Sequence, residues 1–220
     1  ELRLPSCVER IDEGAIMNCP KLRSVGTLPA ALAALGKNNF AGCPKITHLD
    51  FSPCGQLKRL DTICLSNCTR ITLPPSLQII GEKCFAAAAL HSATFEWEAY
   101  TPGVVRLPPS VIYLHKSAFA NCPHLTEVDL SACAGLTVMM RECFAGCRAL
   151  RTVRLPPSLK LLSVGCFEDC ASLEDIGTMP ASLERIGDEC FRGCDRLDRA
   201  KIRAELPVTC PKMTDDKIGM

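Results

Sequence analysis

Apolar and polar positions follow one short pattern that recurs along the chain. The pattern is clearest between Leu150 and Cys170, which read LRTVRLPPSLKLLSVGCFEDC. Val153 and Leu155 alternate with polar residues, and this alternation predicts a short strand. Pro-Pro-Ser follows and ends the strand, because proline cannot donate a hydrogen bond to a neighbouring strand and favours a turn.

The second half of the unit is apolar at a wider spacing. Leu159 and Leu162 are expected to cover the back of a coil, and the C-F-x-x-C segment is expected to form a turn of helix that buries Phe167. A single coil of this kind cannot bury its own apolar face. Neighbouring coils must therefore stack, which aligns their strands into a parallel sheet.

Eight such units are recognisable. The last cysteine of the unit, or the alanine that replaces it once, falls at positions 19, 43, 68, 88, 122, 147, 170 and 194. A period of this size is typical of a solenoid. We expect one repeat domain over residues 1–203, with an irregular insertion near 90–106, and a C-terminal tail over 204–220.

The unit L-P-x-S-L-x-x-I-G-x-x-C/A-F-x-G/N-C-x-x-L resembles the BspA-like leucine-rich repeats, whose core is I-P-x-x-V-x-x-I-G-x-x-A-F-x-x-C-x-x-L. The resemblance covers about Leu2 to Ile202. It implies an α/β repeat fold, a right-handed curved solenoid with a parallel concave sheet, which binds macromolecules. The family includes secreted and surface adhesion proteins. This sequence departs from the pattern before the Phe, where Ala is common but five repeats carry cysteine: Cys64, Cys84, Cys143, Cys166 and Cys190.

The charges of the chain are balanced. Lys and Arg number 25, Asp and Glu number 24, and the net charge is +1. This balance gives no general attraction to nucleic acid or to an anionic membrane. No apolar run approaches the roughly 18 residues that a membrane-spanning helix needs, so we expect no direct membrane insertion.

The 16 cysteines recur mainly at the repeat period. Their i,i+4 spacing within a repeat, as in Cys143 and Cys147, is a poor disulfide geometry. The absence of C-x-x-C and of paired histidines argues against zinc. We expect two columns of buried thiols, while disulfides between adjacent coils or a redox or metal function remain alternatives. Free buried thiols favour an intracellular protein, with a secreted or cell-surface location as the alternative.

Recurrence also argues against an active site. The Phe column has one member per repeat beside a cysteine, which is typical of a core and not of an aromatic binding stripe. The repeated serines of L-P-P-S are turn residues, because catalysis needs one special serine with a base. We therefore expect a protein that is not an enzyme, with no catalytic residues, cofactor or metal.

The residues that flank the centre of each predicted strand differ between repeats and share one face of the sheet. Read in order, they give an acidic middle and a basic C-terminal end, as expected of an electrostatically patterned groove. A merely solvated face is the alternative. The candidate partner-binding residues here are His48, Asp50, Glu127, Asp129, Arg154, Asp175, Arg199 and Lys201.

The insertion adds Trp97 and Tyr100 to this list of candidates. Trp and Tyr are enriched at interface hot spots, although Trp97 could instead fill the gap left by the missing cysteine. Because the insertion precedes the strand that carries Glu127, we expect the two regions to form one contact surface. The sequence thus predicts a non-enzymatic, scaffold-like protein-protein interaction module or a structural subunit of a larger complex. An extracellular adhesion protein is the alternative, and an enzyme a distant one.

Overall fold

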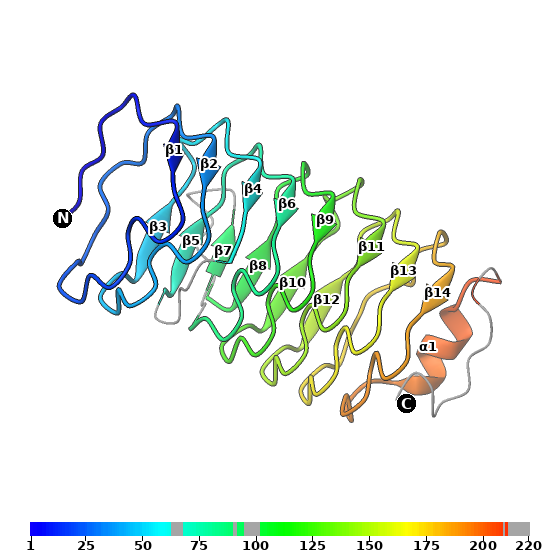
Figure 1. Cartoon of the computed structure of the whole chain (residues 1–220). Helices are drawn as coiled ribbons and strands as arrows, with labels where there is room; N and C mark the ends of the chain where they lie inside the picture. Colours follow the sequence, from blue (N-terminus) through cyan, green and yellow to red (C-terminus); the bar gives the residue numbers. More distant parts are fainter. Residues whose placement is uncertain (63–67, 90–91, 95–101, 209, 211–220) are drawn as a thin grey trace.

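The chain coils into an elongated parallel-sheet solenoid of about seven turns (Figure 1). The computed structural model describes residues 1–62, 68–89, 92–94, 102–208 and 210. The eight predicted repeats are not confirmed as eight complete turns. At the N-terminal end the first coil contributes only an isolated bridge between Leu2 and Val25 to one of the two strand ladders, and at the C-terminal end a helix takes the place of a strand.

The first ladder, which we call sheet 1, corresponds to the predicted sheet. Its strands pair in parallel, and the middle residue of each, such as Val128 or Val153, is buried. The residue that directly follows the strand, such as Leu130, is also buried in the core. In order along the sheet, the strands are β3 (His48–Asp50), β5 (Arg70–Thr72), β7 (Ser92–Thr94), β8 (Val104–Arg106), β10 (Glu127–Asp129) and β12 (Thr152–Arg154).

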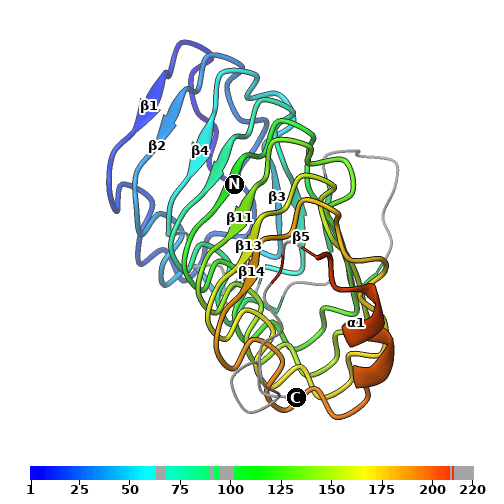
Figure 2. The same cartoon turned by 90° about the vertical axis from the view of Figure 1, so that its right-hand side faces the viewer.

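The backs of successive coils pair to form a second ladder of strands, where the sequence predicted only an apolar cover. We call it sheet 2, and it lies on the other side of the coils (Figure 2). The coils must pair their backbone groups on this side too, because a buried unpaired N–H or C=O is costly. Its strands are β4 (Arg59–Leu60), β6 (Ile79–Ile80), β9 (Tyr113–Leu114), β11 (Val138–Met139), β13 (Leu161–Leu162) and β14 (Arg185–Ile186). β1 (Arg10–Ile11) and β2 (Ala34–Leu35) form a separate pair.

The predicted helical turn at C-F-x-x-C is wrong. The backbone there alternates between ordinary and left-handed conformations, with φ of 56° at Glu142 and 72° at Gly146 on either side of Phe144. Such residues cannot continue an α-helix. The Phe144 N–H instead donates to the Cys166 carbonyl of the next coil, at 2.9 Å. Among the described residues α1 (Arg199–Glu205) is the one α-helix, so the α/β class is not confirmed.

The insertion contributes to one sheet only. In sheet 1, β7 and β8 are neighbours between β5 and β10, whereas in sheet 2 β6 pairs directly with β9. The insertion thus adds a strand to one side of the array without adding a full coil. In the core, the rings of Phe85 and Phe119, which lie in the coils before and after the insertion, meet at 30°, whereas the following pairs lie within 8° of parallel.

The predicted Phe core is confirmed. The rings of Phe119, Phe144, Phe167 and Phe191 stack with centroids 5.3 to 5.8 Å apart, and all four are buried. Stacked aromatic pairs add to the stabilisation that burial alone provides. The column therefore links consecutive coils through the centre of the array.

The buried thiol columns are also confirmed among the described cysteines, all of which are free thiols. The last cysteine of a unit donates its S–H to the Phe carbonyl of the preceding coil, for example Cys147 to Phe119 at 3.1 Å and Cys170 to Phe144 at 3.2 Å. Burial raises the pKa of Cys68 and of Cys133 to about 12. These thiols stay protonated at neutral pH and are poor nucleophiles.

The C-terminal end departs from the predicted strand at Arg199 and Lys201, both of which lie in α1. Asp198 caps the helix by accepting a hydrogen bond from the Lys201 N–H at 3.0 Å. The segment RAKIRAE contains good helix formers, and Ile202 is buried on one side of it. The helix covers the last coil, where the next strand of sheet 1 was expected (Figure 1).

Replacing Phe144 by alanine is expected to lower the free energy of unfolding by about 3–5 kcal/mol, because it opens a cavity in the middle of the stack. Phe144→Leu should cost less, and Thr152→Ala on the outer face should be close to neutral. Denaturant unfolding of the three variants measures this. A loss under about 1 kcal/mol for Phe144→Ala contradicts a core role.

Gly187 and Gly55 form a matched pair for testing how closely the coils approach. A Cβ at Gly187 would lie 2.5 Å from the Val164 backbone nitrogen in the preceding coil, while a Cβ at Gly55 meets nothing within 4 Å. Gly187→Ala should therefore destabilise by about 1–3 kcal/mol, as overpacking does, and Gly55→Ala should not. Equal thermal unfolding of the two variants would contradict this close approach.

Stability should fall in alkali under reducing conditions. The folded pKa of buried thiols such as Cys68 and Cys133 lies above the value of about 8.5 for an unfolded chain. The contribution of these protonated thiols to the free energy of unfolding is complete below about pH 8.5, and it is lost as the pH rises toward the folded pKa. Each such thiol then lowers the free energy of unfolding by up to about 1.4 kcal/mol per pH unit. Urea unfolding at several pH values measures the slope, and Cys133→Ala should flatten it.

Candidate partner-binding surface

Sheet 1 presents two outward rows of side chains. The first outward row runs through the first residue of each strand, and the second outward row through the third. Parallel register places these residues side by side across the sheet. The first row contains His48, Arg70, Val104, Glu127 and Thr152, with Asp175 bridged beyond it, and the second contains Asp50, Thr72 and Thr94 followed by Arg106, Asp129 and Arg154.

Charges alternate at the centre of this face. Asp129 pairs in register with Arg106 on one side and Arg154 on the other. Its Oδ1 accepts hydrogen bonds from the Ser131 N–H at 3.0 Å and from the Ser131 hydroxyl at 2.6 Å. Partial burial alone would raise the pKa of Asp129, but the bonds from Ser131 and the charges of Arg154 and Arg106 outweigh it and lower the pKa. Asp129 is therefore a fixed negative charge between two positive ones.

The predicted charge order needs two corrections. Arg106 belongs to the sheet, so the acidic middle around Glu127 and Asp129 is flanked by arginine on both sides. The basic C-terminal end predicted from Arg199 and Lys201 does not lie on the sheet, since both residues belong to α1.

Lys201 still reaches the edge of sheet 1. Its Nζ lies 3.6 Å from Oδ1 of Asp175, and both side chains are about half exposed. A surface ion pair of this kind contributes little to stability. Asp175 itself joins the sheet only through an isolated bridge to Thr152.

The sequence contained the signal for Arg106. The residues VVRLPP that include Arg106 match the TVRLPP that includes Arg154. Sequence reasoning missed it because it counted residues 90–106 as an irregular insertion. Arg70 was missed because its repeat is shortened after Cys68.

His48 and Asp50 lie at the other end of sheet 1 and are exposed on β3. Burial and the neighbouring Arg70 lower the pKa of His48, which makes it neutral at physiological pH. Asp50 accepts a hydrogen bond from the Ser52 N–H at 2.9 Å. The same turn bond joins Asp175 to the Gly177 N–H at 3.0 Å, so these aspartates also help to end their strands.

A hollow of about 370 Å³ lies beside Arg154 at the C-terminal part of the sheet. Ser131, Thr152, Asp175 and Thr178 line it together with Arg154. The hollow offers hydroxyl, carboxylate and guanidinium groups, which suits a polar segment of a partner and its side chains.

The outward positions of the middle strands differ from the rest. Thr72, Thr94 and Val104 are only 2–5% exposed although they point away from the core. Trp97 and Tyr100 lie outside the described residues. The insertion returns to the sheet as β8, directly beside Glu127, because Val104 and Glu127 are paired in register.

No cluster of His, Cys, Asp and Glu in the described part of the chain could hold a metal ion. None of the described helices is long and apolar enough to span a membrane. Two of the L-P-P-S serines lie within hydrogen-bond distance of carbonyls of the preceding coil: Ser76 Oγ is 3.0 Å from Leu57 O, and Ser110 Oγ is 2.7 Å from Pro75 O and 2.6 Å from Leu77 O. They act in turns between coils, as the recurrence predicted.

Three solved structures illustrate the likeness of the fold. A leucine-rich repeat protein from Bacteroides ovatus has a TM-score of 0.72 at 23% identity, over 90% of this chain and 49% of its own. The T. pallidum leucine-rich repeat protein has a TM-score of 0.58 at 24% identity, over 92% of this chain and 79% of its own. The pneumococcal vaccine antigen PcpA has a TM-score of 0.50 at 19% identity, over 89% of this chain and 60% of its own. The chain thus spans about half the length of the B. ovatus protein.

Family comparison is more direct. No curated protein matches the sequence. The model of the BspA type leucine rich repeat region matches residues 1–101 and 103–208, in six copies. These ranges include both strand ladders and the insertion on either side of position 102. By this match over nearly its whole length, the chain belongs to the BspA type leucine-rich repeat family.

Proposed function

We propose that this chain is a non-enzymatic protein-binding module whose contact surface is the outer face of sheet 1. The observation that supports this most is the row of alternating charges Arg106, Asp129 and Arg154, held in register on adjacent strands. Such a row favours a partner with the complementary order of charges. Rim charges of this kind set orientation and association rate more than total affinity.

The rigidity of the array supports the same proposal. Each strand that carries the charged row is anchored in the core by its buried middle residue, such as Val128 or Val153. A preformed sheet loses little conformational entropy on binding, so more of the contact energy appears as affinity. The module could act alone or as a structural subunit of a larger complex.

Trp97 and Tyr100 remain part of the proposal. An aromatic anchor beside a charged rim is a common hot-spot arrangement, and β8 brings the insertion back to the strand of Glu127. His48, Asp50 and Arg70 extend the proposed surface toward the N-terminal coils. Asp175 and Lys201 extend it toward α1.

A second candidate function is extracellular adhesion. The fold is shared with a pneumococcal vaccine antigen, which favours a secreted or surface protein. The thirteen buried free thiols among the fifteen described cysteines favour the intracellular alternative, because oxidising compartments promote disulfides. Counting thiols in the denatured protein from its native source separates the two. Sixteen free thiols support the intracellular module, and extensive disulfide bonding supports adhesion.

Charge reversal at Glu127 and Asp129 together, each to lysine, is expected to weaken partner capture at least tenfold, because it places four positive charges side by side on β8, β10 and β12. The measurement is quantitative affinity capture from the native source, with circular dichroism to verify folding. Trp97→Ala with Tyr100→Ala tests the insertion in the same assay.

The matched control is Lys58→Glu with Lys160→Glu, which reverses two exposed charges on sheet 2. This variant should capture the same partners as the unchanged protein. If the sheet 1 variants fold and retain every partner, binding occurs elsewhere and the proposed surface is wrong.

A further inference from the structure

The thiols of Cys19 and Cys43 are neighbours in one cysteine column. Cys43 occupies the position of Cys19 one repeat later. The two coils are held in register beside them, because the Asn18 N–H donates to the Ala41 carbonyl at 2.7 Å. The side chain of Cys19 is a hydrogen-bonding neighbour of the Cys43 thiol. The two sulfur atoms therefore lie side by side across the gap between two coils.

This arrangement fits a disulfide between coils. Coils that stack as parallel strands lie about 4.8 Å apart. The Cα atoms of a disulfide lie about 4.4–6.8 Å apart, so the link needs no change of register. Rotation about the two Cα–Cβ bonds is enough to bring the sulfur atoms together.

Access to solvent distinguishes this pair from a second thiol contact in the described part of the chain. Cys122 and Cys147 also contact each other, but both are completely buried. Cys19 is partly exposed, and 6% of Cys43 is exposed. A small oxidant dissolved in water can therefore reach Cys19, whereas the inner pair is protected.

Cys43 is also held less firmly than the inner thiols. Its sulfur lies 3.8 Å from the Ile16 carbonyl, whereas the sulfur of Cys147 lies 3.1 Å from the Phe119 carbonyl. Ile16 stands where six repeats carry Phe. Phe40 has a φ of 67°, a left-handed conformation that is an outlier for a bulky residue. The weaker hydrogen bond leaves the Cys43 sulfur free to form a new bond.

We propose that Cys19 and Cys43 form a peroxide-sensitive site, at which a disulfide joins the first coil to the second. The Cys19 sulfur attacks one oxygen of hydrogen peroxide, the O–O bond breaks, and water leaves, so that Cys19 becomes a sulfenic acid. The Cys43 sulfur then attacks the Cys19 sulfur, and the S–O bond breaks. The hydroxide that leaves takes the Cys43 proton and becomes water. Two thiols thus lose two electrons, and one peroxide is reduced to two waters.

The order of the two steps follows from burial. Burial raises the pKa of the Cys43 thiol, and this effect outweighs the hydrogen bond from the Cys19 backbone. Cys43 therefore stays protonated at neutral pH and reacts slowly with peroxide, because the thiolate is the nucleophile. Cys19 is the more exposed thiol and meets the peroxide first. Cys43 then completes the disulfide.

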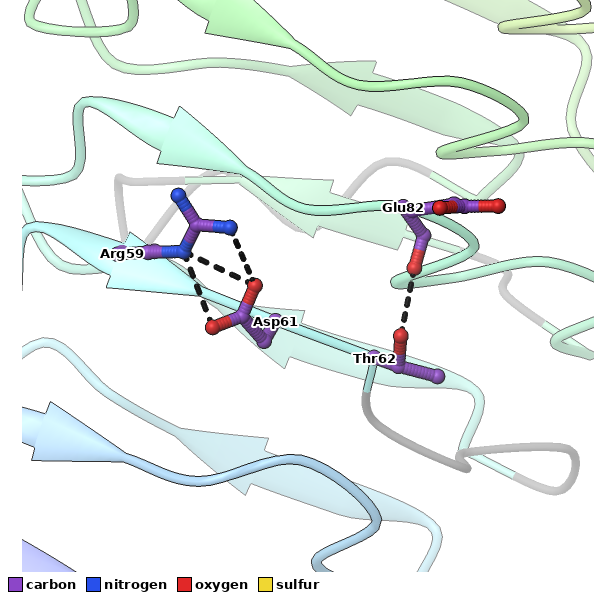
Figure 3. Close-up of polar contacts among 4 residues, drawn as sticks. All are labelled: Arg59, Asp61, Thr62 and Glu82. Atoms are coloured by element: carbon purple, nitrogen blue, oxygen red, sulfur yellow. Dashed lines mark hydrogen bonds and ion pairs between the residues drawn. The ribbon is translucent and has the colours of Figure 1, made fainter. Parts of the chain in front are cut away.

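The disulfide joins coils that share few strand pairs. β1 and β2 form a sheet of their own, and sheet 1 begins at β3. Further along the array a polar side chain ties two coils: the Thr62 hydroxyl donates to the Glu82 carbonyl at 2.7 Å, beside the ion pair of Arg59 and Asp61 (Figure 3). The disulfide adds a covalent tie next to the coil that carries His48.

Treatment of the folded, fully reduced chain with about 1 mM hydrogen peroxide at neutral pH tests the proposal. The remaining thiols are then blocked in denaturant and the chain is digested with trypsin. Cys19 and Cys43 fall in separate peptides, residues 11–21 and 38–45, each with one cysteine. Mass spectrometry should find these two peptides joined, two hydrogens lighter than their sum. Cys122 and Cys147 should remain reduced and serve as the buried control pair.

Two variants test the order of the steps. Cys43→Ser should leave a sulfenic acid on Cys19, which dimedone labels in the peptide of residues 11–21. Cys19→Ser should abolish both the disulfide and this label. If Cys19 and Cys43 stay reduced, or if Cys122 and Cys147 are oxidised as readily, the proposal is overturned.

Hydrogen exchange tests the tie between the coils. Oxidation should slow exchange of the amides of residues 11–21 at least tenfold, because the disulfide opposes local opening of the first coil. The amides of β12 should exchange at the same rate in both states and serve as the control. Equal exchange of residues 11–21 before and after disulfide formation overturns the tie.

Discussion

The structure depends on the requirement that each coil find its partners in the next. In the described part of the chain, a coil has strands of only two or three residues and no internal helix, so its backbone N–H and C=O groups must pair with adjacent coils. The same holds in the core, where Phe144 stacks on Phe119 and Phe167, and the Cys147 thiol donates to the Phe119 carbonyl. Stability is thus a sum of neighbour contacts along the array.

This requirement separates constant from variable positions. The inward residues are mostly leucine, isoleucine, valine, phenylalanine and cysteine, with a few alanines and methionines, because every coil meets a similar coil above and below. Asn39 illustrates the limit. It occupies the position before Phe40 that five other repeats give to cysteine, and it is tolerated because its amide bonds to the Asp12 and Gly36 carbonyls and to the Ile16 N–H. Information about partners therefore lies on the outer faces of the two sheets.

The sequence predicted the parts of the fold that repetition determines. The period, the strand before Pro-Pro-Ser and the Phe and Cys columns follow from identical positions recurring at one spacing. The turn at Cys143 and Cys147 was misassigned because i,i+4 spacing also fits a tight turn with left-handed residues such as Glu142. The strands of sheet 2 were missed because two residues are too few for a visible alternation.

Positions that depart from the repeat were harder to predict, and the candidate surface includes several of them. Arg106 was taken as insertion although its VVRLPP matches the TVRLPP around Arg154, because it follows a long irregular segment. Lys201 was taken as strand because it stands at the strand phase of the repeat, whereas it lies in α1. The insertion itself shows how an exception becomes a feature of the surface. It adds β8 to sheet 1 alone, which places Arg106 beside Asp129. The strand that the insertion adds therefore supplies one of the two arginines that flank Asp129.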